Sequence, residues 1–176
     1  LMLLMAFRHL PFLKPDRGQD AAARLAVEAA GILPGMQVLD VCAAPGGKRF
    51  AAGIGMQNRG SIRSCDLHPH KIQLIEKGAA RLGLTMITAE QQDASVFRPE
   101  WENRMDVVLA DVPCSGFGVI RKKPDIRYHS LLELQEIPTL QLEILKNAAR
   151  YVRPGGVLLY STCTILHQEN EDVVQA

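Results

Sequence analysis

The chain has 176 residues, of which 47% are hydrophobic and 22% charged, which is typical of one soluble globular domain with a real core. A net charge of +1 excludes a global field that attracts nucleic acid, so any such binding must depend on a local patch or on another domain. The four cysteines are far apart and include no Cys-x-x-Cys pair, which excludes a disulfide scaffold or a zinc ribbon and indicates reduced thiols in a cytosolic protein.

The N-terminal residues Leu1–Phe7 are apolar but too short to span a membrane, and they lack the basic region of a signal peptide. Because the first residue is Leu, we expect the chain to be part of a longer protein. Pro11, Pro15 and Gly18 favour a lead-in segment, 1–18, with little regular structure. The remainder, 19–176, reads as one domain.

Strands and helices are expected to alternate along that domain. Hydrophobic patterning predicts strands at 36–41, 61–65, 85–89, 106–110 and 156–160. Helical spacing predicts helices at 19–30, 45–52, 69–82 and 131–151, with another beginning at 168–174. Pro138 is a possible kink or boundary in the long helix. This alternation predicts an α/β fold with a doubly wound, mostly parallel sheet.

A turn that suits a nucleotide-type cofactor follows the first of these strands. Cys42, Ala43, Ala44, Pro45, Gly46, Gly47 and Lys48 lie there in succession. The small residues let the backbone approach a ligand, and the next helix presents its N-terminus. Asp66, at the end of the second strand, can accept hydrogen bonds from ribose hydroxyls, and Asp93, after the third, could hold an adenine amino group. The alternative for both carboxylates is a solvated loop or a helix cap.

Two thiols follow the fourth and fifth strands. The run Asp-Val-Pro-Cys-Ser-Gly contains Asp111 and Cys114, and Ser-Thr-Cys-Thr contains Cys163. Because these strands are expected to be neighbours in the sheet, the two thiols should lie close together at one edge. A free cysteine is usually a small buried hydrophobe. Two of them beside a carboxylate and a cofactor loop fit nucleophilic chemistry better, with Lys48 as the neighbour that could lower a thiol pKa.

The motifs Cys-Ala-Ala-Pro-Gly-Gly-Lys, Asp-Val-Pro-Cys-Ser-Gly and Ser-Thr-Cys-Thr, in this order, resemble the Sun/Fmu family of RNA cytosine-C5 methyltransferases. The resemblance extends from about residue 18 to the end of the chain. It implies S-adenosyl-L-methionine as cofactor, bound at 42–48, Asp66, Asp93 and Asp111. It implies Cys163 as nucleophile, Cys114 as the residue that helps release the product, and Asp111 and Lys48 as active-site partners. A family sheet usually has seven strands, so the resemblance implies a Rossmann-like domain that lacks the last two.

That reaction explains the residue types. Addition of a thiolate to C6 of cytosine makes C5 nucleophilic enough to accept a methyl group from a sulfonium. A carboxyl group near N3 can stabilise the charge that develops on the ring. The target base must also leave its stack to reach the pocket.

A basic loop follows the fourth strand. Arg121, Lys122, Lys123 and Arg127, against Asp125, give a local excess of +3. We interpret this loop as a phosphate contact for ribosomal or transfer RNA rather than as an ordinary solvated loop. His68 and His70 have no evident third partner for a metal, so a helix start is favoured there. Trp101 and Phe97 are interpreted as core residues.

Two other functions stay open. The chain could be a methyltransferase that acts on DNA or on a small molecule, although the Ser-Thr-Cys-Thr motif counts against the DNA enzymes. It could also be a module that holds cofactor or RNA without turnover.

Overall fold

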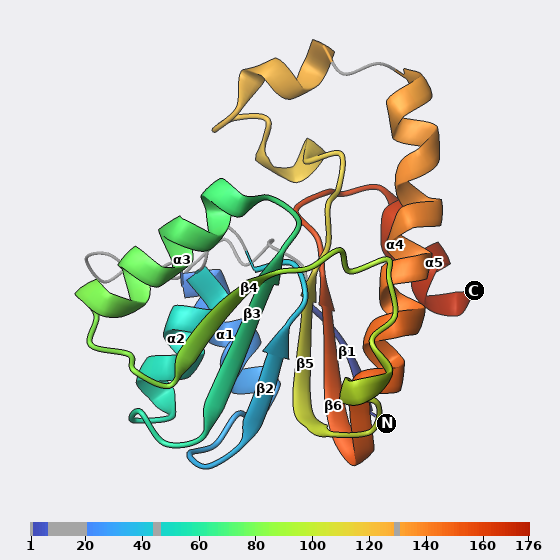
Figure 1. Cartoon of the computed structure of the whole chain (residues 1–176). Coiled ribbons are helices and arrows are strands. Elements are labelled where there is room, and N and C mark those ends of the chain that lie inside the picture. Colours follow the sequence, from blue (N-terminus) through green and yellow to red (C-terminus); the bar gives the residue numbers. More distant parts are fainter. Residues whose placement is uncertain (1, 7–20, 44–46, 129–130) are drawn as a thin grey trace.

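The computed structural model describes residues 2–6, 21–43, 47–128 and 131–176. Six parallel strands form one sheet in the order β1-β6-β5-β2-β3-β4 (Figure 1). The strands are β1 (Met2–Ala6), β2 (Gln37–Asp40), β3 (Ser61–Asp66), β4 (Ile87–Gln91), β5 (Met105–Asp111) and β6 (Val152–Ser161). The helices are α1 (Ala21–Ala29), α2 (Gly47–Gly55), α3 (Pro69–Arg81), α4 (Leu131–Tyr151) and α5 (Glu171–Gln175).

Helices cover both faces of the sheet, and each face has its own hydrophobic core. Successive strand residues point to opposite faces, so Val107 and Leu109 pack with α1 and α2, whereas Val108 packs with α4 and α5. Both faces of β5 are therefore buried, which is why its sequence is a continuous apolar run rather than an alternating one. This arrangement confirms the predicted doubly wound α/β fold.

The predicted order of strands and helices from β2 onward is also confirmed, with boundaries that shift by a few residues. β5 and β6 are direct neighbours, and Asp111 pairs in register with Ser161. The long helix α4 continues through Pro138 without ending there. His68 is the N-cap residue of α3, which confirms the helix start proposed for it.

The interpretation of residues 1–18 as a segment with little regular structure is wrong at its beginning. Met2–Ala6 forms β1, which pairs in parallel with Val157–Ser161 of β6. Because β1 pairs with one edge of β6 and β5 with the other, β6 lies inside the sheet. The prolines and the glycine on which the prediction depended, Pro11, Pro15 and Gly18, lie outside the described residues.

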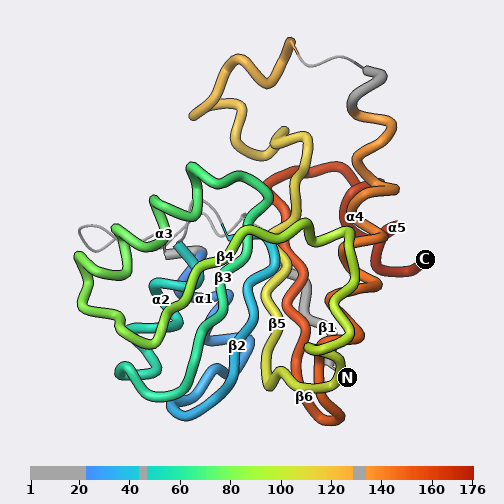
Figure 2. Tube along the Cα trace, viewed as in Figure 1, coloured from blue at the N-terminus to red at the C-terminus, as the bar shows by residue number. Residues whose placement is uncertain are grey.

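The segment between β5 and α4 rises above the carboxyl ends of the strands (Figures 1 and 2). It contains two short 3₁₀ helices, Phe117–Val119 and Pro124–Tyr128. We call 112–128 the upper segment, because it brings chain over the edge where the predicted site residues lie. A third 3₁₀ helix, Pro99–Trp101, precedes β5, and a fourth, His167–Glu169, precedes α5. Over the described ranges, none of the helices combines the length and apolar character that a membrane crossing needs.

Candidate active site

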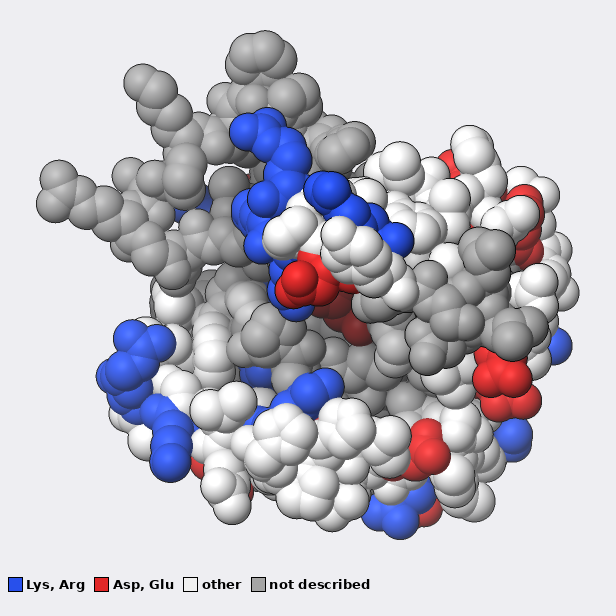
Figure 3. All heavy atoms as spheres, turned by 90° about the horizontal axis from the view of Figure 1, so that it is seen from above, with Lys and Arg blue, Asp and Glu red and all other residues white. Residues whose placement is uncertain are grey.

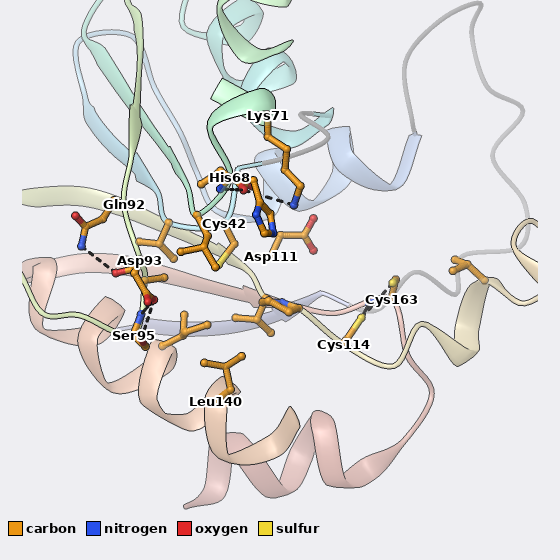
Figure 4. Close-up of a pocket in the computed structure, with 18 of the residues that line it drawn as sticks. Cys42, His68, Lys71, Gln92, Asp93, Ser95, Asp111, Cys114, Leu140 and Cys163 are labelled. Carbon is orange, nitrogen blue, oxygen red and sulfur yellow. Dashed lines mark hydrogen bonds and ion pairs between the residues drawn. The ribbon is translucent and has the colours of Figure 1, made fainter. Parts of the chain in front are cut away.

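A cavity of about 440 Å³ opens at the carboxyl ends of the strands, where ligands bind in open α/β sheets (Figure 4). Residues at or just after the ends of β2, β3, β4, β5 and β6 and residues of α4 line it. Those that matter most for its chemistry are Cys42, Asp66, Asp93, Asp111, Cys114, Lys122, Lys123 and Cys163. The cavity therefore brings together predicted residues from the cofactor turn, the carboxylates, the thiols and the basic loop.

The carboxylates of Asp66 and Asp93 are held by their own turns. The backbone N–H of His68 donates to Asp66 Oδ1 at 3.1 Å, and Lys71 Nζ lies 3.4 Å from the same oxygen. Asp93 Oδ1 accepts hydrogen bonds from the backbone N–H and the hydroxyl of Ser95, at 2.9 and 2.7 Å. Asp66 lines the cavity and is buried, and α3 has no side-chain hydrogen bond at its N-cap, so the alternative of a solvated or capping carboxylate does not describe Asp66.

The predicted cofactor turn is described only at its two ends. Cys42 lines the cavity, and the buried Ala43 donates its N–H to the carbonyl of Cys65 at 2.8 Å. Burial, with nearby carboxylates, raises the pKa of the Cys42 thiol, which keeps it neutral. Gly47 begins α2. Ala44, Pro45 and Gly46 lie outside the described residues.

A buried ion pair lies beneath this turn. Arg49 Nη1 is 3.8 Å from Asp40 Oδ2, and both side chains are almost fully buried. Burial raises the pKa of Asp40 to about 6, although the Arg49 charge opposes that shift. Asp40 was not singled out from the sequence, where it appears as an ordinary residue of the first strand.

Lys48 and Asp111 form a second ion pair, at the cavity. Lys48 Nζ lies 2.6 Å from Asp111 Oδ2, and the hydroxyl of Ser161 donates to Asp111 Oδ1 at 3.0 Å. The pairing brings the predicted catalytic lysine and carboxylate together from α2 and β5. The sequence motif suggested both residues, but the Ser161 contact depends on the register of β5 and β6.

The two predicted thiols are in contact. Cys114 Sγ and Cys163 Sγ lie 3.1 Å apart, and the backbone N–H of Cys163 lies 3.2 Å from Cys114 Sγ (Figure 4). The hydrogen bond with Cys163, together with burial, raises the pKa of the Cys114 thiol. The two sulfurs are close enough to share a hydrogen bond in which either thiol can be the donor. This contact couples the ionisation of one thiol to that of the other.

Gly118 allows the two cysteine loops to approach. Its backbone N–H donates to the carbonyl of Cys163 at 3.0 Å, and a Cβ atom at this position would lie 2.7 Å from that carbonyl oxygen. Any side chain at 118 would therefore push the loop of Cys163 away.

The predicted basic residues are exposed and belong to the upper segment. Lys122 and Lys123 line the cavity, whereas Arg121 and Arg127 do not. Seen from above, a group of Lys and Arg side chains stands beside the hollow, and further Lys and Arg side chains lie across from it (Figure 3). The structure thus divides the basic loop into two lysines at the cavity and two arginines outside its lining.

Residues interpreted as core or as a helix start agree with the structure. Trp101 is buried and Phe97 packs against the same cluster, where it stacks on Tyr151. In the part of the chain that the structure describes, no three His, Cys, Asp or Glu side chains are grouped to hold a metal ion.

The sequence analysis did not identify three buried polar residues behind the thiols: Gln141, Glu169 and Asn170. Glu169 and Asn170 fell within a predicted helix start, where polar residues are common. Glu169 and Asn170 could have been found from their position in the sequence, because they follow Cys163 by only six and seven residues.

The chain is similar to proteins of known family. The family model for the 16S rRNA methyltransferase RsmB/F matches residues 32–176. The probable ribosomal RNA small subunit methyltransferase B of Bacillus subtilis is 46% identical over 160 residues, which are 90% of this chain and 36% of that protein. Ribosomal RNA small subunit methyltransferase F of Escherichia coli K12 is 36% identical over 159 residues, 88% of this chain and 33% of that protein. The chain thus spans about a third of the length of these relatives.

Solved structures show the same fold. The crystal structure of PH0851 has a TM-score of 0.84 and 36% identity, covering 89% of this chain and 36% of that one. NSun6 from Pyrococcus horikoshii, determined with SFG, has a TM-score of 0.77 and 26% identity, covering 94% of this chain and 44% of that one. An O-methyltransferase from Thermotoga maritima shares the fold alone, with a TM-score of 0.64 at 14% identity, covering 90% of this chain and 51% of that one. The match of the family model to most of the sequence, together with these relatives, means that the chain belongs to the 16S rRNA methyltransferase RsmB/F family.

Proposed function

We propose that the chain is the catalytic domain of a cytoplasmic enzyme that transfers a methyl group from S-adenosyl-L-methionine to C5 of a cytosine in RNA. The observation that carries this proposal is the contact between two thiols, 3.1 Å apart, at a cavity that also contains Asp66 and Asp93. A methyl transfer that used only one thiol would leave the presence of the second thiol in contact with it unexplained.

The cavity fits the proposed cofactor in size and in chemistry. Its volume of about 440 Å³ falls in the range of small-molecule sites. Asp66 and Asp93, at the ends of successive strands, provide acceptors for ribose hydroxyls and for an adenine amino group. Bound there, S-adenosyl-L-methionine would supply an electrophilic methyl group on its sulfonium sulfur.

The thiol of Cys163 would begin the reaction on the base. Its thiolate adds to C6, so that a sulfur–carbon bond forms and the electrons of the C5–C6 double bond move into the ring. The pair formed by Lys48 and Asp111, whose charged atoms lie 2.6 Å apart, can hold a proton beside N3 and stabilise that charge. These steps make C5 the nucleophile toward the methyl group.

Cys114 would act in the second half of the reaction. Once C5 carries the methyl group, a base must remove its proton, the C5–C6 double bond forms again, and the bond to Cys163 breaks. The sulfur of Cys114 lies 3.1 Å from that of Cys163, so its thiol can donate a hydrogen bond to the departing sulfur. Lys122 and Lys123 at the cavity are placed to contact phosphate of the RNA strand that carries the base.

The test is release of tritium from RNA that carries tritium at C5 of cytosine, measured with S-adenosyl-L-methionine and compared with a DNA strand of the same sequence. Methyl transfer to C5 expels that tritium into water, so we expect cofactor-dependent release from RNA and little from DNA. Binding of cofactor and RNA without tritium release would instead favour a binding module.

A further inference from the structure

A buried polar pair, Glu169 and Asn170, lies directly behind the two thiols. Neither residue lines the cavity, and their side chains are buried. We propose that this pair positions the thiols relative to each other: Glu169 holds the loop of Cys114, and Asn170 holds the loop of Cys163. Its importance for catalysis rests on the two-thiol reaction proposed above, whereas its effect on thiol spacing does not.

Glu169 holds the peptide units on both sides of Cys114. Glu169 Oε2 accepts a hydrogen bond from the backbone N–H of Ser115 at 2.8 Å and another from Gln141 Nε2 at 3.1 Å. The same amide nitrogen of Gln141 donates to the carbonyl of Pro113 at 2.8 Å. The residues before and after Cys114 are thus fixed to one carboxylate, directly or through one amide.

Asn170 holds the residues around Cys163 in a similar way. The hydroxyl of Thr162 donates to Asn170 Oδ1 at 2.6 Å. Asn170 Nδ2 donates to the carbonyl of Leu166 at 2.8 Å and, over a longer 3.4 Å, to that of Thr164. Both neighbours of Cys163 are therefore linked to one side-chain amide.

Two further contacts join these halves. The hydroxyls of Ser115 and Thr164 lie 2.7 Å apart, which links the two cysteine loops directly. The hydroxyl of Tyr160, near the end of β6, donates to the carbonyl of Glu169 at 2.9 Å. Since Glu169 and Asn170 are adjacent in the chain, one short backbone segment joins the contacts that hold the two loops.

The burial of Glu169 supports a role beyond stability. A buried carboxylate loses its hydration, and Glu169 Oε1 has no hydrogen-bond partner among the residues that the structure describes. An apolar side chain would fill this position without that cost, but it could not hold the backbone N–H of Ser115. What the carboxylate provides is a fixed geometry for Cys114, as supporting residues do for catalytic groups.

The spacing of the thiols can be measured without RNA or cofactor, using phenylarsine oxide as a probe. One molecule of the probe reacts with two thiols, forms two arsenic–sulfur bonds and releases one water. We expect the wild-type chain to bind it tightly, and Cys114→Ala or Cys163→Ala to abolish that binding. Glu169→Ala and Asn170→Ala should weaken it at least about tenfold, because the thiols are no longer preorganised.

Matched variants separate positioning from general destabilisation. Glu169→Gln keeps an acceptor oxygen for Ser115 and should bind the probe within about threefold of wild type, since the key hydrogen bond remains. Val173→Ala removes buried apolar atoms from α5 without touching the pair, and Glu171→Gln removes a nearby carboxylate that pairs with His167. Both controls should keep wild-type probe affinity, even where Val173→Ala lowers the melting temperature. Unchanged affinity in both alanine variants at positions 169 and 170 would overturn the proposal.

A second readout separates the two halves of the pair in the reaction. With RNA, Glu169→Ala should slow product release and accumulate a covalent protein–RNA complex, because Cys114 is displaced. Asn170→Ala should reduce formation of that complex, because Cys163 is displaced, and the KM for the cofactor should change little in either. Equal loss of complex formation in both variants would contradict this division. If the wild-type protein releases no C5 tritium but probe affinity still depends on both residues, the proposed function fails and the positioning role stands.

Discussion

The two sides of the cavity hold their functional groups by different means. On the carboxylate side, Asp66 and Asp93 are oriented by residues only two positions away in the sequence, His68 and Ser95. On the thiol side, the contacts between Ser115 and Glu169 and between Ser115 and Thr164 join residues 54 and 49 positions apart. The carboxylate side chains are therefore held mainly by their own turns, whereas the thiol side is one network that links β5, β6 and α4.

This difference predicts how a substitution on each side of the cavity should act. A substitution on the carboxylate side should change one contact to the cofactor and leave the rest intact, because distant, independent sites act additively. A substitution in the thiol network should change the spacing between the two cysteines, even where it displaces only one of them. The following experiments test this contrast.

The largest effect is expected from the thiols themselves. Cys163→Ala cannot form the covalent bond, so we expect neither methylated RNA nor a covalent complex. Cys114→Ala can still attack and transfer the methyl group, but release should be slow, so that a protein–RNA complex survives denaturing electrophoresis.

Cys65→Ala serves as the control, because it removes a buried thiol of the core. It should keep both methyl transfer and release of the RNA product. A covalent complex in Cys163→Ala, with none in Cys114→Ala, would reverse the two roles and favour the arrangement of the DNA enzymes.

A pH effect is expected from Asp40, beneath the cofactor turn. Its pKa is about 6 in the folded protein against 3.8 for an ordinary carboxyl group. Between pH 4 and 6 the folded state therefore binds more protons than the unfolded state, and the contribution of Asp40 to stability falls as pH rises. Across that window the free energy of unfolding should fall by up to about 3 kcal/mol more in the wild type than in Asp40→Asn.

Denaturant titrations of both proteins at several pH values would measure this difference. Parallel pH profiles for the wild type and Asp40→Asn would show that the Asp40 carboxyl is not perturbed in this way.

Gly118→Ala should damage the thiol network through the backbone. The added Cβ would lie 2.7 Å from the Cys163 carbonyl oxygen, so the loops must separate. We expect a loss of roughly 1–3 kcal/mol in the free energy of unfolding, as for other overpacked sites. Gly55→Ala is the matched control, since nothing lies within 4 Å of a Cβ there. Equal stability of the two variants, measured by denaturant titration, would mean that the contact can relax freely.

Asp66→Ala should weaken cofactor binding without changing the thiols. Loss of hydrogen bonds to a charged acceptor costs roughly 1–3 kcal/mol, which calorimetry with S-adenosyl-L-methionine would detect. Glu76→Ala, on the exposed face of α3, removes a carboxylate outside the cavity and should bind normally. Unchanged affinity in Asp66→Ala would remove this carboxylate from the cofactor site.

The smallest effect is expected from Lys122 and Lys123. Replacing both with Ala should remove up to two phosphate contacts and reduce the slope of log affinity against log salt by about 1.4, the value for single strands. The double variant Lys77→Ala/Arg81→Ala removes the same charge from α3, outside the cavity lining, and should keep the slope. If the slope in the Lys122/Lys123 variant matched that of the wild type, the two lysines would be ordinary surface residues.

Most of the fold could be predicted because its signals are local. The buried run of β5, the helical spacing of α3 and the turn residues at strand ends are all read within a few positions. β1 was missed for the opposite reason. Met2–Ala6 is a short apolar run without the β-branched residues that favour a strand, and it forms one through pairing with β6.

The same division applies to the site. The sequence by itself determined which residue types stand at the strand ends: the carboxylates of Asp66 and Asp93, and the thiols of Cys114 and Cys163. Only the tertiary structure decided that the two sulfurs touch, that Lys48 pairs with Asp111, and that Glu169 and Asn170 lie behind the thiols. The physical reason is that hydrogen bonds between distant segments depend on strand register and helix packing, which leave no periodic trace in the sequence around each residue.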